Sequence, residues 1–214
     1  MTQDAPRKIV GVARESFPGE RRVALVPAQV AVLAKAGFDV LVERAAGTRA
    51  GYLDDEYARL GAELIDTREA VFQRADIVCQ VRAAGANRHA GAEDFKLLRD
   101  GQTLIGMCDP LGQPEIMQNL AGRGVSIFAL ELLPRITRAQ SMDVLSSMAS
   151  VAGYKAVLTA ATLLPRMFPM MMTAAGTITP GRVFVLGAGV AGLQAIATAK
   201  RLGAVVWSYD IRPA

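Results

Sequence analysis

The residues whose types and spacing have the clearest chemical use lie near the end of the sequence. Three glycines at positions 187, 189 and 192 form a Gly-x-Gly-x-x-Gly pattern directly after the apolar segment 182–186, and Asp210 closes the next apolar segment. Such glycines permit a tight turn out of a strand, a close approach of the backbone to a pyrophosphate, and close packing of the helix that follows. The pattern therefore predicts a dinucleotide-binding turn.

Each part of this turn has an expected role. Backbone amides and the positive end of the helix dipole hold phosphates. A carboxylate at the end of the second strand accepts hydrogen bonds from the adenosine ribose and repels a 2′-phosphate, so Asp210 favours NAD(H) over NADP(H), and Arg212 is close enough to soften that preference. The alternative is a strand–helix–strand unit whose glycines serve packing alone. The expected cofactor-binding residues are Gly187, Ala188, Gly189, Val190, Ala191, Gly192, Asp210, Ile211 and Arg212.

The segments before this turn alternate short apolar runs with helical patterns. Strands in regular exchange with helices imply crossover connections and a mostly parallel sheet that is covered on both faces. We therefore expect α/β class, with a doubly wound, flavodoxin-like domain over residues 1–137. Its predicted strands are 8–12, 38–42, 77–81, 103–107 and 125–130.

Residues 138–214 are expected to form a second, incomplete domain. A long helix over 141–164 would connect the two domains, and the strand–helix–strand unit would form the first half of a Rossmann NAD-binding domain. Two strands alone leave an unpaired edge and an open apolar face. Either the sequence is a fragment or another chain completes the sheet. The methionine-rich segment 167–172 is expected to pack against a neighbouring domain or subunit.

Composition excludes several classes of protein. The chain of 214 residues is 51% hydrophobic and carries a formal net charge of +4, and its basic residues are scattered, which gives no indication of a nucleic-acid partner. Cys79 and Cys108 have neither metal-binding nor redox spacing, so we expect reduced, buried thiols and no metal site. The N-terminus does not resemble a signal peptide, and no long uncharged apolar stretch occurs, so we expect a soluble, cytoplasmic protein.

Several segments resemble one known family. The segment 19–27, Gly-Glu-Arg-Arg-Val-Ala-Leu-Val-Pro, is similar to the N-terminal signature shared by alanine dehydrogenases and the NAD-binding domain of proton-translocating NAD(P)+ transhydrogenase. The segment 134–149 resembles the transhydrogenase α subunit almost position for position, as do 152–156 and 210–213. The resemblance spans the whole chain, but only the first half to two-thirds of that NAD-binding domain.

The resemblance implies a function and partners. Enzymes of this type pass a hydride directly between NADH and NADP+ and couple the transfer to proton flow across a membrane. The domain similar to this chain holds NAD(H), a separate domain holds NADP(H), and a third spans the membrane. A homodimer on the cytoplasmic side of the inner membrane, attached through these partner subunits, is expected for the same reason.

The resemblance also implies four residues at the reacting end of the nucleotide. Arg135, Asp143 and Ser146 would orient the nicotinamide carboxamide, and Gln140 would reach toward the nucleotide on the partner domain. Hydride transfer requires two rings held face to face rather than an acid or base, and these polar side chains suit that task. From spacing alone, Arg135 also fits a solvated turn and Asp143 a helix cap.

Two other functions remain as alternatives. Alanine dehydrogenases bind pyruvate with an arginine, which Arg22 matches, but this chain has Gln80–Arg82 at the site of their lysine and Asp109 at the site of their histidine. The only histidine, His89, lies in a polar loop. Amino-acid oxidation is therefore disfavoured. The second alternative is a non-catalytic, truncated NAD-binding or assembly module.

Overall fold

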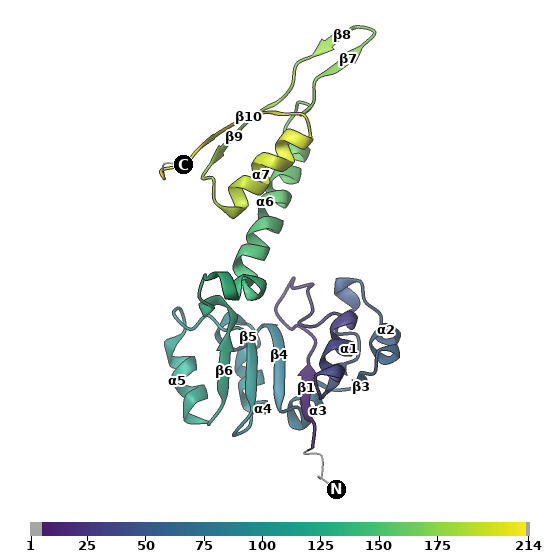
Figure 1. Ribbon diagram of the computed structural model, residues 1–214, viewed down its shortest axis with the longest axis vertical. Helices are drawn as coiled ribbons and strands as arrows, with labels where there is room; N and C mark the ends of the chain where they lie inside the picture. The colour runs from purple at the N-terminus through teal and green to yellow at the C-terminus, as the bar shows by residue number, and fades with distance from the viewer. Residues whose placement is uncertain (1–5, 213–214) are drawn as a thin grey trace. The chain divides into compact units, whose positions relative to one another are not determined.

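The computed structural model describes residues 6–212 and divides into two compact units, Met1–Pro134 and Arg135–Ala214. Figure 1 shows their elements. The sequence placed the division after residue 137. The structure places it three residues earlier, between Pro134 and Arg135.

A six-stranded sheet forms the centre of the first unit. Its order is β3-β2-β1-β4-β5-β6, and all pairs are parallel. This confirms the α/β class. The order differs from the flavodoxin-like arrangement because β3 adds a strand beyond β2, which gives the order of the dinucleotide-binding doubly wound fold. The strands are β1 (Lys8–Val12), β2 (Phe38–Glu43), β3 (Glu63–Ile65), β4 (Ile77–Arg82), β5 (Thr103–Met107) and β6 (Ser126–Ala129).

Helices connect these strands, and local sequence explains where several of them begin. Pro27 occupies the first turn of α1, where its missing N–H costs nothing. The Thr67 hydroxyl accepts a hydrogen bond from the Ala70 amide and caps α3. The helices of this unit are α1 (Pro27–Lys35), α2 (Asp54–Arg59), α3 (Arg68–Arg74), α4 (Gly91–Leu97) and α5 (Pro114–Gly122), with 3-10 turns η1 (Thr48–Ala50), η2 (Ala84–Ala86) and η3 (Leu130–Leu132).

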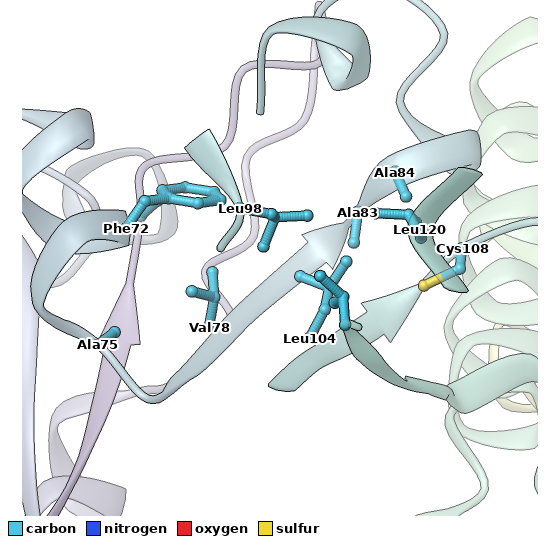
Figure 2. Close-up of a cluster of buried hydrophobic side chains, with 11 residues drawn as sticks. Phe72, Ala75, Val78, Ala83, Ala84, Leu98, Leu104, Cys108 and Leu120 are labelled. Atoms are coloured by element: carbon cyan, nitrogen blue, oxygen red, sulfur yellow. The ribbon is translucent and has the colours of Figure 1, made fainter. Parts of the chain in front are cut away.

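Both faces of the sheet carry a hydrophobic core. On one face, valines of β1 and β2 pack with Val30 of α1 and Tyr57 of α2. On the other, Leu41 packs with Val71 of α3. The largest buried cluster brings β4 and β5 together with helices α3 and α5, as Figure 2 shows with Phe72, Val78, Leu98, Leu104 and Leu120. In β2, alternate residues thus face opposite layers, in agreement with the expected sheet covered on both faces.

The second unit begins with a 3-10 turn and a long helix. The expected helix over 141–164 is divided: η4 spans Thr137–Met142, and α6 spans Val144–Leu163. The division falls at Asp143, whose side chain accepts a hydrogen bond from the Ser146 amide and starts α6. By length and composition, α6 is the one helix among residues 6–212 that would suffice to cross a membrane, although it carries Lys155 and buries Gly153 and Val157 within its own unit.

A strand–helix–strand unit follows, formed by β9 (Arg182–Leu186), α7 (Val190–Arg201) and β10 (Val205–Tyr209). The two strands pair in parallel, and α7 lies beside α6. A small core joins them, in which Val157, Phe168 and Ala199 are buried against residues that include Val183 and Val206. The side chains on the opposite face of the two strands stay exposed, including Phe184, Leu186, Trp207 and Tyr209.

The methionine-rich segment leads into a hairpin that the sequence reasoning missed. Strands β7 (Met171–Thr173) and β8 (Gly176–Ile178) pair in antiparallel fashion around a turn. Met170 and Met172 are exposed in this unit. Three-residue strands lie below the length at which alternation becomes visible in a sequence, which explains the omission.

Candidate functional site

The glycine-rich turn between β9 and α7 has a backbone that only glycine allows at two of its positions. Gly187 has φ +92°, in the left-handed region, and its amide donates to the Tyr209 carbonyl at 2.7 Å. A Cβ at Gly192 would collide with the Gly187 carbonyl. Gly187 is therefore required by its backbone conformation and Gly192 by close packing, and both requirements come from the protein itself.

Gly189 is different, because open space surrounds the position that its Cβ would take. The nearest atom there is Nη2 of Arg212, at 3.9 Å. Gly189 is also the N-cap residue of α7, and no side chain caps this helix. The amides of the first turn of α7 therefore lack an intrahelical acceptor beside an open space, which is the arrangement that binds anions at helix N-termini.

Asp210, at the end of β10, holds the turn together. Its Oδ2 accepts a hydrogen bond from the Ala188 amide at 2.6 Å, and its Oδ1 accepts from the Arg212 amide at 2.9 Å. These bonds, together with the Arg212 guanidinium, lower the pKa of Asp210 to about 2. The carboxylate is thus ionised at neutral pH, at the edge of the glycine turn. Ile211 is exposed beside it.

A hollow of about 370 Å³ lies where this turn faces the start of α6. Arg135 and Ser146 line it together with residues of the glycine turn. Two of the four residues expected at the nicotinamide therefore lie beside the expected phosphate site. Its lining residues are Arg135, Leu145, Ser146, Ala149, Leu186, Gly187, Gly189, Val190, Ala191 and Gly192.

The other two of those four residues do not line the hollow. Asp143 accepts hydrogen bonds from the Ser146 amide at 2.9 Å and the Ser146 hydroxyl at 2.6 Å, which lower the pKa of Asp143. It acts as the helix cap that its spacing also allowed. Gln140 is exposed in η4.

The bond to Asp143 determines what the Ser146 hydroxyl offers to the hollow. A hydroxyl has one hydrogen, and that of Ser146 is donated to the carboxylate. Its oxygen lone pairs remain, so toward a ligand Ser146 acts as an acceptor. Arg135 has only donors. Together the two side chains match the NH2 and C=O groups of a carboxamide.

A contact between Gly153 of α6 and the first turn of α7 positions this hollow, and the sequence alone did not predict it. A Cβ at Gly153 would collide with the carbonyl of Ala191 in the first turn of α7. Ser146, Ala149 and Gly153 are spaced so that they share one face of α6. The same face that touches α7 therefore carries the serine. An isolated glycine within an apolar helix was the available signal.

In the first unit, the residues considered for amino-acid chemistry are bound to internal partners. Glu20 accepts from Arg22 Nη2 at 2.7 Å and from Arg82 Nε at 3.1 Å, and these arginines share its carboxylate. Gln80 is buried and donates to Asp94. Asp109 pairs with Arg88 at 3.0 Å.

The two thiols of the first unit are unreactive at neutral pH, and its histidine lies at the surface. Cys108 is buried and Cys79 is half-buried, and burial raises their pKa values to about 12 and about 11. They therefore stay protonated at neutral pH. His89 is exposed, and its ring packs edge-on against the ring of Phe17, with the two ring centroids 5.1 Å apart.

Two family models, for the two domains of one family, match consecutive parts of this chain. The model described as "Alanine dehydrogenase/PNT, N-terminal domain" matches residues 11–152, and that described as "Alanine dehydrogenase/PNT, C-terminal domain" matches residues 156–214.

Individual relatives are similar over nearly all of this chain. An NAD(P) transhydrogenase subunit alpha polypeptide of Rhodospirillum rubrum is 45% identical over 205 residues, covering 96% of this chain and 53% of that protein. Alanine dehydrogenase of Bacillus subtilis is 30% identical, over 95% of this chain and 52% of that protein. The crystal structure of transhydrogenase from Sinorhizobium meliloti superimposes with a TM-score of 0.89 and 48% identity, over 96% of this chain and 57% of that chain. The chain thus spans about half the length of these relatives.

Proposed function

Because the chain belongs to the alanine dehydrogenase/PNT family, we propose that it is the NAD(H)-binding component of a proton-translocating NAD(P)+ transhydrogenase. The observation that carries the proposal is the open space at the Cβ position of Gly189, beside the uncapped amides of α7, in a turn whose Ala188 amide is bonded to the ionised Asp210 carboxylate. A pyrophosphate fits the first group and a ribose the second. The higher identity to the transhydrogenase subunit than to alanine dehydrogenase favours this member of the family.

The residues around the hollow have complementary roles in this proposal. The turn from Gly187 to Gly192 would hold the pyrophosphate, and Asp210 the adenosine ribose. Arg135 and Ser146 would hold the carboxamide of the nicotinamide, since they supply donors and an acceptor. Asp143 is a positioning residue in this proposal, because its carboxylate fixes the Ser146 hydroxyl.

The bound nucleotide supplies the hydride, so the protein needs no general acid or base at this site. Its task is to fix the ring and to present it to a second nucleotide. We infer that NADP(H) is held by a partner domain, and that exposed Gln140 reaches toward it. A membrane-spanning proton-channel subunit, a homodimer and a location on the cytoplasmic face of the inner membrane complete the proposal.

Alanine dehydrogenase activity is the second candidate within the family. The residue types argue against it, because Asp109, where those enzymes have a histidine, carries a carboxylate that is paired with Arg88. Gln80 stands in the segment where those enzymes have a lysine. A binding module without catalysis is the third candidate.

The experiment mixes the full-length protein that contains this sequence with an NADP-binding partner domain and follows the NADH-dependent reduction of thio-NADP+. We expect turnover that requires both components. A second arm supplies pyruvate, ammonia and NADH to the full-length protein alone. Turnover only in the second arm would establish the dehydrogenase. NADH binding without turnover in either arm would establish the binding module.

A further inference from the structure

Arg212 is bound to Asp210 through both its backbone and its side chain. Its amide donates to Asp210 Oδ1 at 2.9 Å, and its Nε donates to the same oxygen at 3.3 Å. The Asp210 side chain is largely buried, at 16% exposure, whereas that of Arg212 is 73% exposed. The guanidinium is therefore held at one end by a fixed carboxylate and has solvent at the other.

The guanidinium also lies next to the expected ligand. Nη2 of Arg212 is the nearest atom to the space above Gly189. The Ala188 amide, in the same turn, is bonded to the other oxygen of Asp210. A nucleotide in this turn would therefore have its ribose beside the carboxylate and the guanidinium at once.

We propose that Arg212 is a specificity-determining residue, a latent 2′-phosphate-binding arginine that Asp210 keeps neutralised, so that the pair selects NAD(H) over NADP(H). This inference rests on the proposed function, because it requires a dinucleotide in the glycine turn. It adds that discrimination depends on the Asp210–Arg212 pair and not on the carboxylate alone.

The physical argument compares the two nucleotides. A ribose 2′-hydroxyl can donate to Asp210 while the exposed guanidinium of Arg212 stays paired or solvated. A 2′-phosphate brings negative charge to a carboxylate that is already ionised, and it must compete with that carboxylate for Arg212. Arginine binds phosphate well when it has no internal partner, through charge-assisted bidentate hydrogen bonds. Removing the charge of Asp210 therefore leaves the Arg212 guanidinium free to bind the 2′-phosphate.

The experiment compares ADP-ribose with 2′-phospho-ADP-ribose, which share the pyrophosphate and lack the nicotinamide. Their affinities for the full-length protein are measured by calorimetry at low and at high salt. Asp210→Asn keeps an oxygen that can accept from Ala188 but loses the charge. Asp210→Ser, which also removes the charge, is the second variant should the first not fold. Both are combined with Arg212→Ala, with Arg212→Lys, and with Arg201→Ala, which removes an exposed arginine at the far end of α7.

We expect wild-type protein to prefer ADP-ribose. Asp210→Asn should bind 2′-phospho-ADP-ribose at least about tenfold more tightly than wild type does, because a charge-assisted hydrogen bond to the phosphate is gained. The gain should vanish in Asp210→Asn/Arg212→Ala, survive in part in Asp210→Asn/Arg212→Lys, and survive fully in Asp210→Asn/Arg201→Ala. It should also shrink at high salt.

Two results would overturn the inference. If Asp210→Asn/Arg212→Ala keeps the full gain, removal of like-charge repulsion alone explains the selectivity. If neither Asp210 variant gains affinity while wild-type protein binds ADP-ribose, Arg212 is no phosphate ligand, and the proposed function stands without it. Failure of wild-type protein to bind either compound would overturn the proposed function together with the inference.

Discussion

Gly153 in the middle of α6 touches the carbonyl of Ala191 in the first turn of α7, with no space for a side chain between them. This contact places the two helices against each other at the point where the glycine turn ends. The hollow that contains Ser146 and the turn depends on it, because both line it from these two helices.

Gly153→Ala should separate α6 from α7 and destabilise the second unit by about 1–3 kcal/mol, as is typical of overpacking, because its Cβ alone collides with the Ala191 carbonyl. Thermal unfolding followed by circular dichroism would measure the change. Gly122→Ala is the matched control, because it adds a methyl group to a helix where no atom lies within 4 Å. An equal loss of stability in both variants would contradict the importance of the contact.

Substitutions at two glycines of the turn should have different consequences. Gly192→Ala collides with the Gly187 carbonyl and should destabilise the fold by about 1–3 kcal/mol. Gly189→Ala has space for its methyl group, so the melting temperature should stay near that of wild type while NADH binding weakens by about tenfold or more, since the methyl group occupies the phosphate site.

NADH binding to these variants can be followed through the single tryptophan, Trp207, whose fluorescence NADH should quench. Gly189→Ala with unchanged quenching would show that the nucleotide does not approach this turn.

Ser146→Ala should impair hydride transfer more than nucleotide binding. Loss of the acceptor that orients the carboxamide should lower the transfer rate by about tenfold, because misplacement of reacting groups is costly. Affinity for ADP-ribose, which lacks that group, should change little. The measurement is transfer to thio-NADP+ beside calorimetry with ADP-ribose. Equal losses in both would indicate that Ser146 has a structural role only.

The ion pairs of Glu20 with Arg22 and Arg82 should make the stability of the first unit sensitive to acid. The side-chain hydrogen bonds from Arg22 lower the pKa of Glu20 from 4.5 to about 2, with opposition from burial and a further contribution from Arg82. Because the folded-state pKa is lowered, this stabilisation is complete above about pH 4.5 and is lost as the pH falls toward 2.

Glu20→Gln should therefore cost about 1–2 kcal/mol at pH 7, a value reduced by solvent screening of the partly exposed arginines, and less near pH 3. Unfolding by urea across this pH range measures the difference. A constant difference between the variant and wild type at all pH values would contradict the assigned ionisation.

Local signals in the sequence were strong enough to place most of the elements. Strand segments such as 8–12 and 103–107 combine an apolar run with flanking turn residues, and they form β1 and β5 over those residues. The long helix was predicted to start at residue 141, but α6 starts at Val144. The residues from 141 to 143 are compatible both with a helix and with a cap at Asp143, so their pattern alone does not fix the first residue of the helix. The β7–β8 hairpin was missed because its strands are too short to show a period.

The sequence by itself determined the α/β class and the Gly-x-Gly-x-x-Gly turn with its carboxylate, because periodicity and glycine spacing act over neighbouring residues. Only the tertiary structure decided that β3 extends the first sheet, that Asp143 is bound to Ser146 and does not line the hollow, and that Arg212 is paired with Asp210 above Gly189. Strand order and side-chain pairing depend on which of several compatible partners comes within hydrogen-bonding distance, and that is fixed only when the chain has packed.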